Sequence, residues 1–170
     1  MAIIFDLDQT LVDSQSLLEL RRARRWQAVY NRIPELKPFD GIPELLADLC
    51  HAGVPMCIVT SSPSLYCGRI IQQCKLPIPT TVCYHDTSLR KPHPAPILEA
   101  LRRLNVPPEA AAAVGDDAND TIAARSAGVL SIGVSWGSLD RAALVASNPD
   151  VLCADVPALR AFLEARFRRP

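Results

Sequence analysis

The stretch Ala2-Ile3-Ile4-Phe5-Asp6-Leu7-Asp8-Gln9-Thr10 places two carboxylates at the end of a short apolar run. Apolar residues that give way at once to polar ones predict a buried strand that stops near Asp6. Because side chains on a strand alternate between its two faces, Asp6 and Asp8 leave the strand end on the same side. The opening of the chain therefore predicts a pair of carboxylates that face one ligand.

Three further polar elements recur along the chain. Thr60-Ser61 follows the apolar run 54–59, and Gly115-Asp116-Asp117-Ala118-Asn119-Asp120 follows the run 111–114. Lys91-Pro92 stands between these two elements. Because open parallel sheets bind ligands at the carboxyl ends of their strands, we expect the four elements to meet in one site.

The crowding of carboxylates in this site predicts a metal ion. The carboxylates concerned are those of Asp6, Asp8, Asp116 and Asp120. Such a cluster is electrostatically costly unless a cation lies within it or one member holds a proton. Oxygen ligands favour a hard cation, and Mg²⁺ fits best because it combines a few carboxylates with water and phosphate oxygens.

Phosphate is the ligand that the remaining polar residues favour. A phosphate dianion that approaches an aspartate is repelled unless cations and hydrogen-bond donors neutralise its oxygens. Lys91 supplies an ammonium group, and Thr60 and Ser61 supply hydroxyl groups. The sequence therefore predicts a metal-dependent phosphoryl-transfer site.

These elements, in this order, resemble the four signature motifs of the haloacid dehalogenase superfamily: Asp-x-Asp-x-Thr, a Ser or Thr, a Lys, and Gly-Asp-x-x-x-Asp. The similarity is greatest to the phosphoglycolate phosphatase-like branch, through the stretches 6–14, 91–96, 115–128, 133–137 and 148–150. The resemblance implies a Rossmann-like α/β core and a Mg²⁺-dependent hydrolase that acts on phosphate monoesters, with a small phosphorylated molecule as its partner.

The resemblance also implies a role for each site residue. Asp6 would be the nucleophile that becomes an aspartyl phosphate, and Asp8 the general acid and base. It assigns Mg²⁺ binding to Asp6, Asp116 and the backbone carbonyl of Asp8, a water-mediated metal contact to Asp120, and phosphate binding to Thr60, Ser61 and Lys91.

The chain departs from the pattern of this branch at two places. Gln9 stands where members usually have glycine, the residue that most freely adopts a positive φ. Members also carry a substantial helical cap between the first and second motifs, whereas here only residues 15–38 are available for it. We therefore expect a minimal helical cap inserted in a core that is otherwise a single domain, residues 1–170.

Other functions compatible with these motifs remain open. A phosphomutase would use the same motifs, although it needs a closing cap that excludes water. A shortened cap also leaves room for a macromolecular substrate, such as a nucleic-acid end or a phosphoprotein. A dehalogenase needs neither Asp8 nor Asp116, and a phosphorylatable receiver domain carries its acidic residues in a different order along the chain.

The composition agrees with a single soluble domain. The chain of 170 residues suits one core, and its formal net charge of zero gives no reason to expect a membrane surface or nucleic acid. The N-terminal apolar stretch is too short for a signal peptide, so we expect a cytoplasmic enzyme. The six cysteines form no Cys-x-x-Cys pair, which predicts reduced thiols.

Apolar runs that alternate with amphipathic segments predict a doubly wound parallel sheet. Strands are expected near residues 2–7, 54–60, 80–84, 111–115, 129–134 and 150–153. Helices are expected near residues 15–32, 42–51, 63–75, 94–105, 118–127, 139–146 and 156–168.

The predicted helix 15–32 carries the basic run Arg21-Arg22-Ala23-Arg24-Arg25. This run could attract anionic substrates toward Asp6, but Arg-rich helix faces are common, and we favour a solvated face. Structural roles are likewise favoured for Asp117 as a helix cap, for Trp136 as a packed loop residue, and for His51, His85 and His93.

Overall fold

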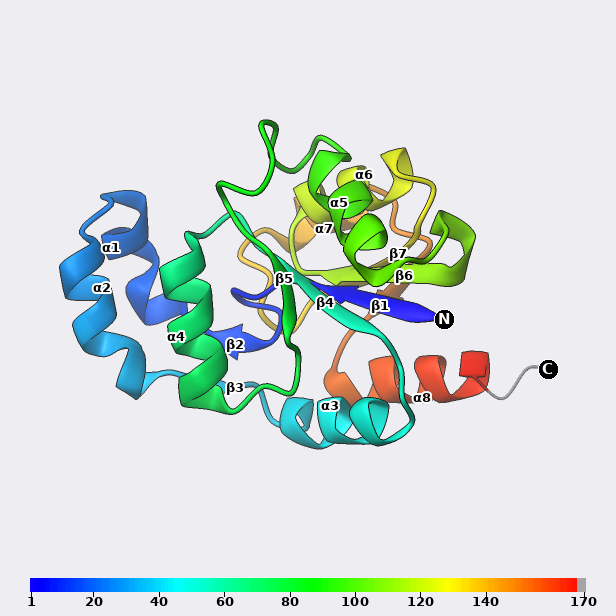
Figure 1. Ribbon diagram of the computed structural model, residues 1–170, viewed down its shortest axis with the longest axis horizontal. Coiled ribbons are helices and arrows are strands. Elements are labelled where there is room, and N and C mark those ends of the chain that lie inside the picture. Colours follow the sequence, from blue (N-terminus) through cyan, green and yellow to red (C-terminus); the bar gives the residue numbers. More distant parts are fainter. Residues whose placement is uncertain (168–170) are drawn as a thin grey trace.

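The computed structural model, in which residues 1–167 are described, is built on a six-stranded parallel sheet (Figure 1). The order across the sheet is β5 (Thr80–Val82), β4 (Met56–Val59), β1 (Ala2–Phe5), β6 (Ala111–Gly115), β7 (Leu130–Val134) and β8 (Val151–Cys153). Each of these strands lies within or at the edge of a run predicted from the sequence. The first strand is central, so Asp6 leaves the middle of the sheet.

Helices cover both faces of the sheet, as Figure 1 shows. One face carries α3 (Ile42–His51) and α8 (Val156–Phe167), and the other carries α5 (Ala95–Leu104), α6 (Ala118–Ser126) and α7 (Arg141–Ala146). The side chains of β1 alternate accordingly: Ile3 and Phe5 enter one hydrophobic cluster, and Ala2 and Ile4 enter the other. The predicted doubly wound α/β fold is confirmed.

The helix predicted over residues 15–32 is wrong, because the chain breaks it into short pieces. The pieces are η1 (Gln15–Leu17), α1 (Leu18–Arg22), α2 (Trp26–Arg32) and η2 (Ile33–Glu35). Arg24 has a φ of 54°, a left-handed conformation that no right-handed helix can contain. The chain therefore reverses at this residue, and α1 and α2 pack against each other.

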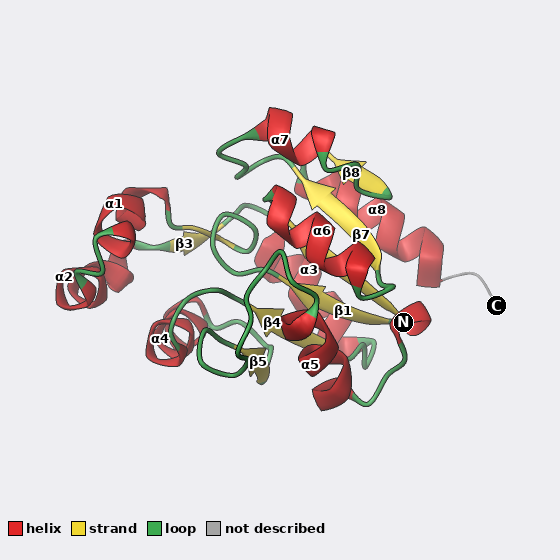
Figure 2. Cartoon of the chain, turned by 90° about the horizontal axis from the view of Figure 1, so that it is seen from above, coloured by secondary structure: helices red, strands yellow, loops and turns green. Residues whose placement is uncertain are grey.

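A two-stranded antiparallel ribbon, not predicted from the sequence, lies at the base of these helices. It pairs β2 (Val12–Asp13) with β3 (Lys37–Pro38). In Figure 2 this ribbon joins α1 and α2 to the core. The helices rest on α4 (Ser64–Cys74), where the ring centroids of Trp26 and Tyr66 lie 6.0 Å apart. That residues 15–38 act as a shortened cap stays a prediction.

The cysteines and the lengths of the helices bear on what the composition predicts. All six cysteines are free thiols, as predicted. Within residues 1–167, no helix combines the length and the apolar character needed to cross a membrane. The end of the last predicted helix, at residue 168, falls outside the described residues.

Candidate active site

The predicted site residues meet in one cavity of about 250 Å³. The cavity lies where β1, β4 and β6 end, since Asp6, Thr60 and Asp116 directly follow these strands. Its lining includes all the residues predicted from the sequence, namely Asp6, Asp8, Thr60, Ser61, Lys91, Asp116 and Asp120. The parallel sheet therefore brings together side chains that are far apart along the chain.

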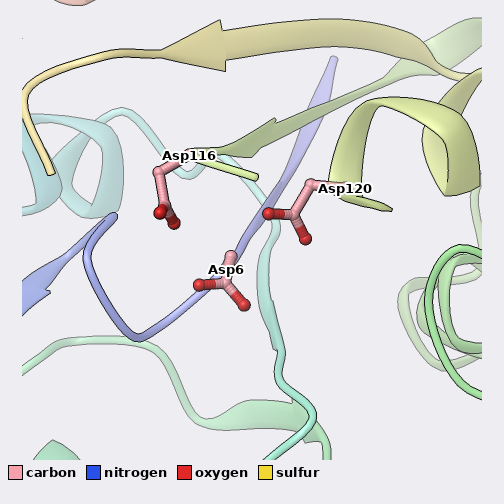
Figure 3. A group of neighbouring side chains, drawn as sticks. All are labelled: Asp6, Asp116 and Asp120. Carbon is pink, nitrogen blue, oxygen red and sulfur yellow. The ribbon is translucent and has the colours of Figure 1, made fainter. Parts of the chain in front are cut away.

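Three carboxylates form the acidic part of the cavity (Figure 3). One oxygen each of Asp6, Asp116 and Asp120 lies within 4.8 Å of the others. Burial, with the nearby charge of Asp120, raises the pKa of Asp116 to about 7, although the Thr10 hydroxyl donates to Asp116 Oδ1 at 2.9 Å. Burial also raises the pKa of Asp6. This crowded, all-oxygen donor set fits a hard divalent cation such as Mg²⁺.

Lys91 supplies the positive charge of the site. Its Nζ donates to Asp6 Oδ1 at 2.6 Å, to Asp120 Oδ1 at 2.5 Å and to the carbonyl oxygen of Val59 at 3.1 Å. Burial alone would lower the pKa of Lys91, but the charges of Asp120 and Asp6 outweigh it and raise that pKa. The ammonium group is therefore held charged between two carboxylates.

Asp117, the residue before α6, and Gly115, the last residue of β6, position the Asp120 side chain. Asp120 Oδ2 accepts from the backbone N–H of Asp117, and Asp117 Oδ1 accepts from the N–H of Asn119 at 2.8 Å. The predicted capping role of Asp117 is thus confirmed. A Cβ on Gly115 would lie 2.4 Å from the Asp120 side chain, so only glycine at this position lets Asp120 reach Lys91.

Asp8 lines the same cavity but does not belong to the group of three carboxylates, and its side chain is surrounded by donors. Its Oδ1 accepts from the hydroxyls of Ser14 at 2.6 Å and Tyr66 at 2.7 Å. Its Oδ2 accepts from the Ser62 hydroxyl at 3.0 Å and pairs with Arg21 Nη2 at 2.8 Å. Both oxygens of the carboxylate are therefore occupied by donors.

This network corrects the interpretation of the basic run. We predicted a solvated face, and Arg22, Arg24 and Arg25 are exposed as predicted. The prediction is wrong for Arg21, whose side chain is only 19% exposed and reaches into the cavity. Ser62 and Tyr66 were missed, since single hydroxyl residues carry no sequence signal. Ser14 lies in the stretch 6–14 that resembles the family, which was the one available clue.

The remaining predicted residues have distinct surroundings. Thr60 is buried, and its Oγ1 accepts from the N–H of Ser62 at 3.1 Å, whereas Ser61 is exposed at the cavity. Trp136 donates through Nε1 to the carbonyl oxygen of Thr10 at 3.1 Å, so its predicted packing role is confirmed. His93 accepts from the N–H of Ala95 at the start of α5, a structural contact.

The turn after the two aspartates forms despite the departure at Gln9. Gln9 adopts a φ of 67°, and its N–H donates to the carbonyl oxygen of Val12 at 2.9 Å. The carbonyl of Gln9 lies against Gly137, where a Cβ would come within 1.9 Å of its oxygen. The side chain is 6% exposed, and its Nε2 has no hydrogen-bond partner among the described residues. The turn therefore carries a conformational cost that a glycine would not.

The Gln9→Gly variant is expected to be more stable than the wild type by about 1 kcal/mol, because glycine removes the left-handed strain and the unpaired buried amide. For a chain of this size that corresponds to a rise in Tm of about 2–4 °C. Thermal unfolding followed by circular dichroism measures it. Gln27→Gly, in the exposed part of α2, is the control and should lower the Tm. A Gln9→Gly protein that melts below the wild type would contradict this explanation.

The fold of this chain occurs in proteins of known structure. A crystal structure from Thermotoga maritima, a candidate beta-phosphoglucomutase, superposes with a TM-score of 0.79 and 23% identity, covering 96% of this chain and 98% of that one. This likeness shows the shared fold.

Curated relatives are similar in sequence. A candidate pyrophosphatase, PpaX, from Caldanaerobacter subterraneus is 35% identical over 119 residues, 69% of this chain and 54% of the relative. A phosphoglycolate phosphatase from Xylella fastidiosa is 36% identical over 116 residues, 67% of this chain and 50% of the relative. The chain thus spans about half the length of the curated relatives it matches. Residues 18–134 match the family described as haloacid dehalogenase-like hydrolase. The chain belongs to the haloacid dehalogenase-like hydrolase family.

Proposed function

We propose that the protein is a Mg²⁺-dependent phosphatase that hydrolyses small phosphate monoesters through an aspartyl phosphate on Asp6, and that it acts in the cytoplasm. One observation carries the proposal: Lys91 lies 2.6 Å from Asp6 within a cluster of buried carboxylates. A carboxylate beside a fixed cation at a strand end can attack a phosphorus atom whose charge is neutralised around it.

The first half-reaction transfers the phosphoryl group to the enzyme. Lys91, Thr60 and Ser61 hold the phosphoryl oxygens. A carboxylate oxygen of Asp6 forms a bond to phosphorus while the ester P–O bond breaks, and the departing oxygen takes its electron pair and a proton from Asp8. Bound Mg²⁺, held by Asp6, Asp116 and the backbone carbonyl of Asp8, would offset the negative charge of the phosphoryl oxygens.

The second half-reaction returns the enzyme to its starting state. Asp8, now ionised, takes a proton from a water molecule as that water forms a bond to phosphorus. The bond between phosphorus and the Asp6 oxygen then breaks, which releases inorganic phosphate and restores the carboxylate. Arg21 and the hydroxyls of Ser14, Ser62 and Tyr66 hold Asp8 as the ionised carboxylate of this second half-reaction. One of these donors gives way when Asp8 carries the proton of the first half-reaction.

Replacing Asp8 tests its proton-transfer role. Asp8→Asn is expected to slow the hydrolysis of esters with poor leaving groups, such as alkyl phosphates, about a hundredfold more than that of activated aryl phosphates. The reason is that an alcohol needs a proton as it departs, whereas an activated phenol does not. Steady-state rates of phosphate release on a matched alkyl and aryl ester give the comparison. Equal losses on the two esters would argue against an acid role for Asp8.

Metal binding can be tested without turnover. Mg²⁺ at millimolar concentration should raise the Tm of the wild type, because a cation relieves the repulsion among the buried carboxylates. Asp116→Asn should abolish the rise, whereas Asp117→Asn should keep it. Asp120→Asn should raise the Mg²⁺ concentration needed for half of this effect about ten- to a hundredfold, as expected of a residue that contacts the metal through water. A larger loss for Asp117→Asn than for Asp116→Asn would overturn this assignment.

A panel of substrates tests the function as a whole. Phosphate release should be measured with Mg²⁺ on small esters, including phosphoglycolate, beside phosphopeptides and phosphorylated oligonucleotides. Catalytic turnover on small esters supports a phosphatase, and isomerised product without release indicates a phosphomutase. A single phosphoryl transfer that then halts indicates a receiver-like protein. The only residues of the short insertion 15–38 that line the cavity are Leu18 and Arg21 of α1. So small a contribution favours hydrolysis over a mutase reaction, which needs a cap that excludes water.

A further inference from the structure

A second cavity, of about 370 Å³, adjoins the candidate active site. The two cavities share Leu18, Arg21, Ser61 and Ser62 in their linings, so they lie side by side. A phosphate ester bound at Asp6 would extend its leaving group into this space. The volume is within the range of pockets that bind a whole small molecule, and it exceeds what a group as small as glycolate would fill.

Arginines from one short segment line this second cavity. Arg21, Arg22 and Arg24 all contribute to it. Arg21 pairs with Asp8, and Arg22 forms an exposed pair with Glu19 at 3.1 Å. No carboxylate of the described residues pairs with Arg24. Arg24, which has a left-handed φ of 54°, follows the end of α1 and lines the cavity as an exposed residue. The cavity therefore offers positive charge to a second anionic group.

Aromatic side chains from separate segments complete the lining. Trp26 enters from α2, and Tyr84 and His85 enter from the loop after β5. Trp26 is held in place by stacking on Tyr30, with ring centroids 6.2 Å apart, and Tyr84 meets His85 edge to face at 4.8 Å. These fixed rings present apolar surface in the same cavity as the guanidinium groups. Aromatic rings beside arginines suit a nucleobase and its phosphate, and on Tyr84 one face is already covered by the Arg90 guanidinium, 4.1 Å from the ring centroid.

We propose that this cavity binds the leaving group of a nucleoside bisphosphate, an inference that rests on the proposed function. One phosphate of the substrate would be hydrolysed at Asp6, the second would pair with Arg22 and Arg24, and the base would lie against Trp26 or Tyr84. A mononucleotide unit suits the volume, and the formal net charge of zero gives no attraction for a long polyanion. The reaction releases inorganic phosphate and a nucleoside monophosphate.

Turnover tests the proposal through a difference between substrates. The wild type with Mg²⁺ should hydrolyse adenosine 3′,5′-bisphosphate with a kcat/KM at least about tenfold above that for ribose 5-phosphate, because one charge-assisted phosphate contact is worth about that factor. Arg24→Gln should lower the kcat/KM for the bisphosphate about tenfold. It should leave the kcat/KM for acetyl phosphate unchanged, because acetyl phosphate is too small to reach the cavity. Arg25→Gln, a neighbour outside the lining, should change neither.

Binding separates this proposal from the proposed function. Calorimetric titration of the Asp6→Asn variant with adenosine 3′,5′-bisphosphate and Mg²⁺ should show binding that Arg24→Gln, added to this variant, weakens about tenfold and Arg25→Gln does not. Binding without turnover in the wild type would overturn the proposed function and keep the cavity assignment. No binding, equal effects of the two arginines, or tighter binding of a phosphorylated oligonucleotide than of the mononucleotide would overturn the cavity assignment.

Discussion

The Asp6→Asn variant is expected to lose phosphatase activity by at least about a thousandfold, because an amide cannot form the aspartyl phosphate. The side chains of aspartate and asparagine have nearly the same shape, so the cavity should keep its form. Asp6→Asn also removes one of the carboxylates whose mutual repulsion burial makes costly. Phosphate release and thermal unfolding, measured on the same preparation, should therefore show an inactive but folded protein.

Asp40→Asn provides the matched control for this substitution. Asp40 is an exposed residue that precedes α3 and lies outside the cavity, so its replacement should leave both rate and Tm unchanged. An Asp6→Asn protein that retains near wild-type turnover would contradict the mechanism. An inactive but unfolded Asp6→Asn protein would contradict the expectation that the shape of the cavity survives.

The Lys91→Met variant is expected to lose both activity and stability. Without Lys91, the buried carboxylates Asp6 and Asp120 keep no cationic partner within residues 1–167, and breaking a buried ion pair costs about 3–5 kcal/mol. The Tm should fall by about 10 °C in the absence of metal. Mg²⁺ should restore part of this loss, because it offsets the same two carboxylates. Activity should stay low with Mg²⁺, since the phosphoryl group loses a fixed donor.

Thermal unfolding with and without Mg²⁺ checks this expectation. Lys37→Met, at an exposed lysine in β3, is the control and should change neither the Tm nor its response to metal. A Lys91→Met protein as stable as the wild type without Mg²⁺ would show that the Lys91 contacts do not balance the buried charges.

The sheet and its site could be predicted because strand ends are marked locally. An apolar run that gives way to Asp6, Thr60 or Asp116 shows where a strand stops, and parallel pairing then brings these ends to one edge. Physical reasoning from single residues also gave the capping role of Asp117, because a helix start needs an acceptor for its free N–H groups.

The surroundings of Asp8 could not be predicted in the same way. Arg21 reaches Asp8 from α1, which ends at Arg22, and no pattern in the sequence requires so short a helix or the left-handed residue Arg24 that follows it. The sequence also gives no signal for the ribbon of β2 and β3, since each strand is very short and β3 contains Pro38, a poor strand former. Contacts that depend on such breaks and short pairings are set by tertiary packing.

Chemical trapping of the enzyme during turnover tests the central claim most directly. Borohydride reduces an acyl phosphate to an alcohol, so it converts a phosphorylated aspartate to homoserine. Quenching the wild type with borohydride during turnover, followed by peptide mass spectrometry, should place homoserine at position 6, in a yield that depends on Mg²⁺ and substrate. No homoserine in an enzyme that is turning over, or homoserine at Asp8 or Asp116 instead, would contradict the assignment of Asp6 as the nucleophile.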